Sequence, residues 1–163
     1  MQTFRVSVNK DYLVFASAHF ITLRGHHCER LHGHNYRVGI TVEGSVDAEV
    51  SFVVDFSELK QIARRVVDAI DHKVLLPLAN PKVTVTDTET SVHVAVNGAP
   101  RYTFPRGDCA LLPIPNTTAE MLAQYLGTQV EADLRSRGIT HLSLLELEVE
   151  ESPGQTATYR RAL

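Results

Sequence analysis

Residues 32–42 have the sequence HGHNYRVGITV, which combines a strand pattern with two residues of a type that ligates metals. From Tyr36 to Val42, apolar and polar residues alternate, as in a β-strand with one buried face. His32 and His34 lie two residues apart at the start of this stretch, and the period of a strand points both toward that face. The sequence therefore predicts a strand whose buried row ends in two imidazoles.

A second strand is predicted upstream, at Leu13–His19, and five of the eight histidines fall between His19 and His34. Buried imidazoles lose basicity and leave ring nitrogens without partners, a cost that ligation of Zn²⁺ by neutral imidazole offsets. Exposed loop histidines are the alternative, and for any single histidine that alternative is the commoner one. For the set of His19, His32 and His34 we predict a zinc site with an open fourth position, as in catalytic sites.

The two cysteines, Cys28 and Cys109, are too few for a disulfide framework. Cys28 lies four residues before His32, and the spacing leaves two roles open. It could be a fourth ligand that closes the site, or a free thiolate activated by the cation and the nearby histidines.

Two helices are predicted from their start signals. Asp55-Phe-Ser-Glu58 is a capping-box pattern, and apolar residues follow it at helical spacing as far as Ile70. A second capping box, Thr117-Thr-Ala-Glu120, begins a helix that ends by Gly138. We therefore assign both threonines to capping, with Glu120 completing the box.

After the second helix, apolar residues alternate with glutamates from Leu145 to Val149, which predicts a strand with one solvated face. Residues 157–161 are its predicted hairpin partner. Glu151 has the parity of the buried face, so its carboxylate needs partners there. The alternative is that the strand frays into a polar turn before Pro153.

Between the helices, residues 82–104 predict three short strands, with Asn97-Gly98 as the hairpin turn between the last two. No repeat or low-complexity linker is present, so we predict a single domain, 1–163, with residues 82–112 as an insertion. The fold class is α+β: two helices on one face of an antiparallel four-stranded sheet, plus an inserted small β-meander.

The bulk composition excludes several classes of protein. A net charge of −3 gives no electrostatic footprint for nucleic acid, and no apolar run approaches the roughly 18 residues that a membrane span needs. The N-terminal segment lacks the features of a secretory signal. We expect a cytoplasmic protein with neither nucleic-acid nor membrane partners.

Several motifs, taken in order, resemble those of the 6-pyruvoyl-tetrahydropterin synthase and 6-carboxytetrahydropterin synthase family. They are Phe15-Ala-Ser-Ala-His19, Cys28-Glu-Arg-Leu-His32-Gly-His34-Asn-Tyr36, Val54-Asp-Phe-Ser-Glu-Leu-Lys60, Asp71-His72, Thr118-Ala-Glu120, and Glu151 followed by Tyr159. The resemblance covers nearly the whole chain apart from the insertion.

The resemblance implies a role for each of these residues. The three histidines bind zinc, Cys28 is the general base and not a ligand, and the Asp71-His72 pair assists proton transfer. Glu151 grips the pterin ring, and Thr118 and Glu120 lie among the expected substrate-binding residues. Arg24, His26 and His27 are candidate triphosphate contacts by charge and proximity alone.

The resemblance also implies the tunnelling fold, in which sheets of three subunits join into a barrel and two such rings stack as a dimer of trimers. Active sites then lie between subunits, with zinc and Cys28 from one chain and Asp71-His72 from a neighbour. An open sheet with exposed edges is physically suited to such closure.

The implied reaction is zinc-dependent conversion of 7,8-dihydroneopterin triphosphate to 6-carboxy-5,6,7,8-tetrahydropterin, a precursor of 7-deazapurines such as queuosine, with loss of triphosphate and acetaldehyde. The short gap between Cys28 and His32 resembles this branch of the family. Three alternatives stay open: the pyruvoyl branch, another tunnelling-fold pterin enzyme such as an aldolase, and a non-catalytic zinc-binding assembly module.

Overall fold

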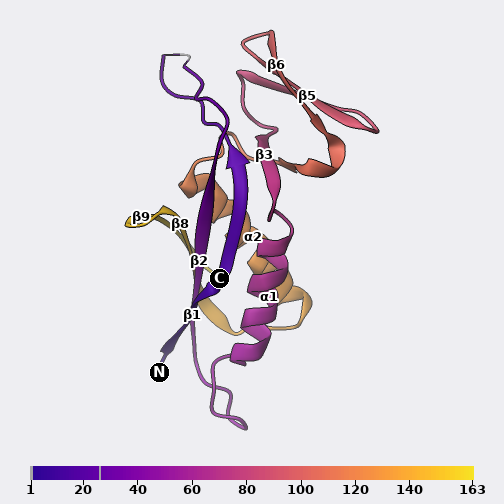
Figure 1. Cartoon of the computed structure of the whole chain (residues 1–163). Coiled ribbons are helices and arrows are strands. Elements are labelled where there is room, and N and C mark those ends of the chain that lie inside the picture. The colour runs from indigo at the N-terminus through magenta and orange to yellow at the C-terminus, as the bar shows by residue number, and fades with distance from the viewer. Residues whose placement is uncertain (1, 26) are drawn as a thin grey trace.

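The computed structural model describes residues 2–25 and 27–163, and for residues 10–12 it describes the backbone alone. His26, one of the candidate triphosphate contacts, lies outside the described residues. Within them the chain is a mixed α+β fold, with two helices beside a long twisted sheet and a small separate sheet at one end (Figure 1). No helix among these residues is long and apolar enough to cross a membrane.

The elements follow one another as β1 (Phe4–His19), β2 (His32–Gly44), α1 (Phe56–Asp68), β3 (Lys73–Pro77), β4 (Val83–Asp87), β5 (Ser91–Val96), β6 (Ala99–Pro105), a 3₁₀ turn (Arg106–Asp108), β7 (Cys109–Leu112), α2 (Ala119–Ser136), β8 (Leu142–Ser152) and β9 (Gln155–Ala162).

The main sheet has six strands in the order β7-β3-β1-β2-β8-β9. The four predicted strands, β1, β2, β8 and β9, are present, but the predicted sheet of four strands is wrong because β3 and β7 extend it. The pairs β1/β2, β2/β8 and β8/β9 are antiparallel, whereas β3 pairs in parallel with both β1 and β7. Both added strands are short and largely apolar, and β3 buries residues of both parities, such as Leu75 and Leu76. A strand covered on both faces loses the alternation that marks a half-buried strand, so its pattern gives no period to detect.

The two helices share the main core with β1, β2 and β8, and the strands supply alternate residues such as Val38, Ile40 and Leu147. Asp55 is the N-cap of α1, as predicted, and its side chain accepts a hydrogen bond from the Ser57 amide. The capping box predicted for α2 is wrong by one residue. Its N-cap is Thr118, which puts Met121 at the third helical position and leaves Glu120 unable to complete the box.

The β4-β5-β6 meander is a separate antiparallel sheet with the predicted turn at Asn97-Gly98, where both residues have positive φ. The inner residues of the meander form a second apolar cluster with Phe20, Leu76 and Cys109 of the main body. The final four residues of the predicted 82–112 insertion are β7, a strand of the main sheet. The meander is therefore packed directly against the segment that follows β1.

Candidate metal centre

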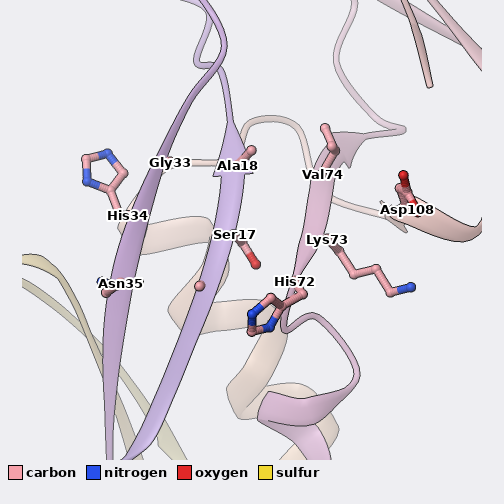
Figure 2. A pocket seen from close by; sticks show the side chains of 10 residues that line it. Ser17, Ala18, Gly33, His34, Asn35, His72, Lys73, Val74 and Asp108 are labelled. Atoms are coloured by element: carbon pink, nitrogen blue, oxygen red, sulfur yellow. The ribbon is translucent and has the colours of Figure 1, made fainter. Parts of the chain in front are cut away.

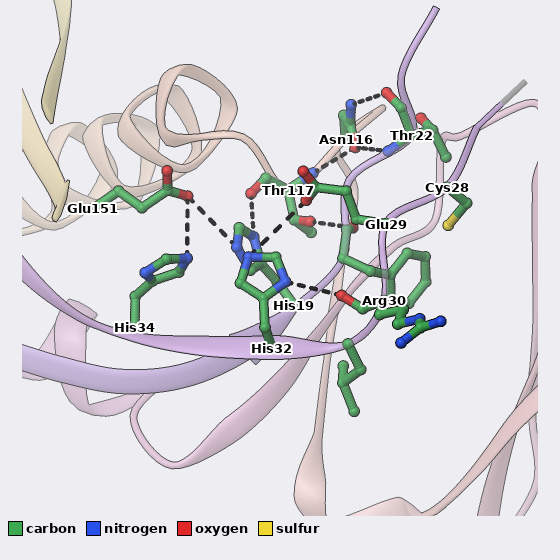
Figure 3. Close-up of polar contacts among 12 residues, drawn as sticks. His19, Thr22, Cys28, Glu29, Arg30, His32, His34, Asn116, Thr117 and Glu151 are labelled. Atoms are coloured by element: carbon green, nitrogen blue, oxygen red, sulfur yellow. Dashed lines mark hydrogen bonds and ion pairs between the residues drawn. The ribbon is translucent and has the colours of Figure 1, made fainter. Parts of the chain in front are cut away.

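Pairing of β1 with β2 brings the three predicted zinc ligands together. His19 lies opposite His32 in the antiparallel register, and Ser17 lies opposite His34 on the same pair of strands (Figure 2). One potential ligand atom from each histidine lies within 4.8 Å of the other two. Figure 3 shows the three rings converging from the ends of the two strands. The predicted convergence is confirmed.

Backbone carbonyls set the tautomer of two of these histidines. Nδ1 of His19 donates to the Thr117 carbonyl at 2.8 Å, and Nδ1 of His32 donates to the Arg30 carbonyl at 2.9 Å. A carbonyl oxygen only accepts, so the proton of each neutral ring is on Nδ1 and the lone pair is on Nε2. Such a hydrogen bond is the usual support behind a metal-ligating histidine.

The His19 ring fits a metal ligand closely. Its side chain is buried, and its Nε2 atom has no hydrogen-bond partner. Burial lowers the pKa of His19 below 6.5, against the opposing effects of the Thr117 hydrogen bond and the Glu151 carboxylate. A buried, neutral imidazole with an unpartnered lone pair is costly alone and is satisfied by a cation. The residues present therefore fit a divalent metal held by three nitrogens.

Thr117 ties this centre to the start of α2. Its hydroxyl donates to the Phe20 carbonyl at 2.9 Å, while its own carbonyl accepts from His19. The side-chain oxygen and nitrogen of Asn116 bond to the amide and carbonyl of Thr22. Thr117 thus supports His19, whereas Thr118 caps the helix.

Two carboxylates flank the histidines. Oε1 of Glu151, at the end of β8, lies 3.5 Å from His19 Nε2 and 4.0 Å from His34 Nε2. On the other side, Oε2 of Glu29 lies 4.0 Å from His32 Nε2. The buried parity inferred for Glu151 agrees with its place beside buried His19, although 26% of its side chain remains exposed. A pocket of about 530 Å³ adjoins Glu151 and His34 and gives a ligand access to both.

Glu29 was missed by the sequence reasoning. The available signal was an acidic residue in a loop, three positions before His32, and such residues are usually solvated. Only the folded loop turns this carboxylate toward the imidazole.

Among the described residues, the one group of side chains placed to hold a metal comprises the three histidines, and Cys28 is not part of it. Its half-buried side chain packs against the apolar cluster shared with the meander, and Figure 3 shows Cys28 apart from the three imidazole rings. Burial raises the pKa of the Cys28 thiol, while the Arg101 guanidinium acts in the opposite direction. The closed arrangement with Cys28 as fourth ligand is therefore not the one that the described residues form.

Asp71 and His72 form a pair, as predicted, but lie apart from the metal-ligating group. Oδ1 of Asp71 accepts from the Ala16 amide at 2.8 Å, and Oδ2 lies 2.9 Å from Nδ1 of His72. Burial acts to raise the pKa of Asp71, but its hydrogen bonds outweigh burial and hold that pKa below 3.8. His72 has positive φ and 81% of its side chain exposed, at the rim of a pocket of about 480 Å³ that also reaches His34 (Figure 2).

The other predicted contacts are more peripheral. Thr118 accepts a hydrogen bond from the Met121 amide, and Glu120, Arg24 and His27 are exposed. Their roles in binding stay predictions.

Comparisons with known proteins agree with the resemblance. Residues 8–162 match the sequence profile of a family described as 6-pyruvoyl tetrahydropterin synthase. A Methanocaldococcus jannaschii protein, provisionally assigned as a 6-carboxy-5,6,7,8-tetrahydropterin synthase, is 34% identical over 152 residues, covering 93% of this chain and 91% of its own. The Haemophilus influenzae 6-carboxy-5,6,7,8-tetrahydropterin synthase is 25% identical over 157 residues, 94% of this chain and 97% of its own.

Solved structures of the Plasmodium vivax 6-pyruvoyltetrahydropterin synthase are also similar. Two are described as catalytic residue mutants in which a glutamate is replaced by alanine or by cysteine. Each is 28% identical to this chain, with a TM-score of 0.92 and coverage of 100% of both chains. Because the coverage is complete, the similarity includes the β4-β5-β6 meander.

Proposed function

The chain belongs to the 6-pyruvoyl tetrahydropterin synthase family, and from that premise we propose that it converts 7,8-dihydroneopterin triphosphate to 6-carboxy-5,6,7,8-tetrahydropterin in a zinc-dependent reaction, with loss of triphosphate and acetaldehyde. The observation that carries the proposal is the convergence of three imidazoles, with the buried Nε2 of His19 unpartnered, beside the carboxylate of Glu151. This arrangement offers a cation site and an acceptor for a donor-rich ring in one place.

Glu151 is the proposed pterin anchor. A pterin presents a ring N–H and a 2-amino group side by side, and a carboxylate accepts from such a pair in bidentate fashion. The partly exposed side chain at the end of β8 is accessible to a ligand entering the adjoining pocket.

His19, His32 and His34 would hold the zinc ion through neutral ring nitrogens. When bound, the cation supplies Lewis-acid polarisation of the hydroxyls on the substrate's side chain, which lowers the barrier to removal of adjacent carbon-bound protons. The Thr117 and Arg30 carbonyls orient two of the rings for this purpose.

Cys28 is the first candidate for the group that removes those protons, as the family resemblance implies. Glu29 is the second, favoured by a specific observation: its carboxylate faces His32, whereas Cys28 packs against the apolar cluster. The P. vivax relative, with a glutamate described as catalytic, makes a carboxylate base chemically credible on this fold. The variants Cys28→Ala and Glu29→Gln distinguish the two candidates. Replacing the residue that accepts the proton should abolish turnover while zinc is retained.

Asp71 and His72 would serve a neighbouring subunit. The Asp71 carboxylate fixes the imidazole through Nδ1 and leaves the exposed Nε2 edge to exchange protons with a substrate across an interface. The sheet has two open edges, β7 and β9, and their pairing in a barrel of the tunnelling fold would remove them. Light scattering then gives a mass about six times the 18.1 kDa of one chain.

Product identification tests the function directly. Pure zinc-loaded protein is incubated with 7,8-dihydroneopterin triphosphate, and products are identified by mass spectrometry. We expect 6-carboxy-5,6,7,8-tetrahydropterin with equimolar acetaldehyde and triphosphate. A pyruvoyl product without acetaldehyde assigns the chain to the other branch, an aldol-cleavage product with triphosphate retained assigns it to another pterin reaction, and no turnover by zinc-loaded protein supports the assembly module.

A further inference from the structure

The meander contacts the backbone of the loop that leads into His32. Arg101 and Tyr102 are consecutive residues of β6, and both reach residues 28–31. The Arg101 guanidinium donates to the Glu29 carbonyl at 2.9 Å and to the Cys28 carbonyl at 3.4 Å. The Tyr102 hydroxyl accepts from the Leu31 amide at 3.2 Å.

The same short loop is held on its other side by the chain that follows β1. The Glu29 amide donates to the Ile21 carbonyl at 2.9 Å, and Thr22 forms an isolated antiparallel bridge with Cys28. Three successive carbonyls, those of Cys28, Glu29 and Arg30, thus accept from Arg101 or from the His32 ring. An irregular loop segment of this kind has a defined path only while such partners exist.

Arg101 and Tyr102 are themselves fixed. The Arg101 Nε atom donates to the Tyr102 hydroxyl at 3.1 Å, and its guanidinium carbon lies 5.3 Å from the centre of that ring. The Tyr102 ring packs against Phe20 and Phe104 at centroid distances of 5.6 and 5.5 Å. A planar guanidinium with several fixed donors loses little further freedom when it binds two carbonyls.

We propose that Arg101 and Tyr102 are positioning residues, which fix the backbone of residues 28–31 and so set where Cys28 and Glu29 stand relative to His32. The inference rests on the proposed function for its catalytic meaning. The meander then has a role at the site, because β6 holds residues 28–31, which carry the two candidate proton acceptors, in a fixed position. Misplacing a reacting group by about 1 Å costs on the order of a hundredfold in rate, so loss of these contacts should lower kcat measurably.

The competing explanation is that these contacts merely dock the meander on the body of the protein. The two explanations predict different effects of mutation on hydrogen exchange, kcat and Tm. Loss of positioning frees the Leu31 amide and the Cys28 and Glu29 carbonyls, and it lowers kcat while the meander stays folded. Loss of docking lowers Tm and exposes β4-β6 while kcat at low temperature is unchanged.

Arg101→Met and Tyr102→Phe test the proposal in zinc-loaded protein, because each keeps most of the packing and removes the bonds to the loop. Hydrogen exchange is followed by mass spectrometry, and kcat and KM are measured with 7,8-dihydroneopterin triphosphate. We expect the Leu31 amide to exchange at least about tenfold faster in Tyr102→Phe, with β1 and β2 unchanged. We also expect kcat to fall by about 10- to 100-fold in both variants, with unchanged zinc content and KM.

Arg101→Lys retains one cationic donor and is expected to recover part of kcat. Arg106→Met is the matched control, since Arg106 pairs with Asp87 at 2.6 Å and this contact does not involve the loop. Wild-type exchange and wild-type kcat in Arg101→Met and Tyr102→Phe would overturn the proposal, as would a lower Tm with faster exchange confined to β4-β6. If wild-type protein turns over no substrate, the proposed function fails, and exchange at Leu31 alone still decides whether β6 holds the loop.

Discussion

Removal of the metal is expected to lower the free energy of unfolding, and the burial of His19 gives the expected size of the loss. The wild-type protein and the His32→Ala variant are each measured with and without a chelator. About 41% of the His32 side chain is exposed, so its truncation removes a ligand with little loss of packing. Because the His32 ring also donates to the Arg30 carbonyl, the effect on metal binding is read from the zinc content and from the response to chelator.

The magnitude follows in two ways. Without a cation, the buried Nε2 of His19 is unsatisfied, which costs about 1–3 kcal/mol. Linkage gives a similar figure, because free zinc at about 100 times its dissociation constant stabilises the folded chain by about 2.7 kcal/mol. In a chain of this size each kcal/mol shifts Tm by about 2–4 °C, so chelation should lower Tm by about 5–11 °C.

The assay is thermal unfolding together with zinc analysis of dialysed protein. Wild-type protein should hold one zinc per chain and respond to chelator, whereas His32→Ala should hold substoichiometric zinc and show no response. His93→Ala is the control, since His93 is exposed on β5 and its ring bonds to Thr103 within the meander. A His32→Ala protein that keeps one zinc and the full chelator shift would refute the three-histidine site.

Three further outcomes are expected. Glu151→Gln should weaken binding of a pterin analogue by a few kcal/mol in a titration, because it replaces an acceptor with a donor. Glu148→Gln, on the opposite face of β8, should leave affinity unchanged, and equal affinities of the two variants would refute the anchor. The depressed pKa of Asp71 contributes stability that is complete above its ordinary value of 3.8 and is lost as pH falls below it. Asp71→Asn should therefore reduce the loss of stability at acid pH, measured by circular dichroism. An unchanged dependence of stability on pH would contradict this. A Cβ on Gly127 would lie 2.7 Å from the Tyr159 ring, so Gly127→Ala should cost about 1–3 kcal/mol in denaturant unfolding, and Gly107→Ala, with open space around it, should cost far less.

The predictable parts of the fold are the elements whose apolar residues recur at a regular interval along the sequence. Strands β1, β2 and β8 each bury one face, and α1 and α2 each bury one stripe, so alternation and helical spacing identify them. Strands β3 and β7 join the sheet by parallel pairing of short apolar runs, which the local pattern does not distinguish from other buried segments.

The start of α2 shows a different limit. Thr117 and Thr118 are adjacent hydroxyl residues, and both are good caps by local chemistry. The choice is made by tertiary contacts: Thr117 is drawn into the core by its bonds with Phe20 and His19, and Thr118 is left to cap the helix. The convergence of the three histidines was predictable because strand parity alone aligns His32 with His34, and the register of β1 with β2 then adds His19.

The position of the Glu29 carboxylate beside His32 was not predictable, because it depends on the path of an irregular loop. If the alternation of β2 continued backward from His32, Cys28 would share the side of the imidazole and Glu29 would point away. The strand begins only at His32, and the preceding residues follow a path set by Ile21, Arg101 and Tyr102. On that path the carboxylate of Glu29 faces His32 and the thiol of Cys28 faces the apolar cluster. Parity is a property of regular strands, so which side chain of this loop faces His32 depends on contacts with a meander some 70 positions away in the chain.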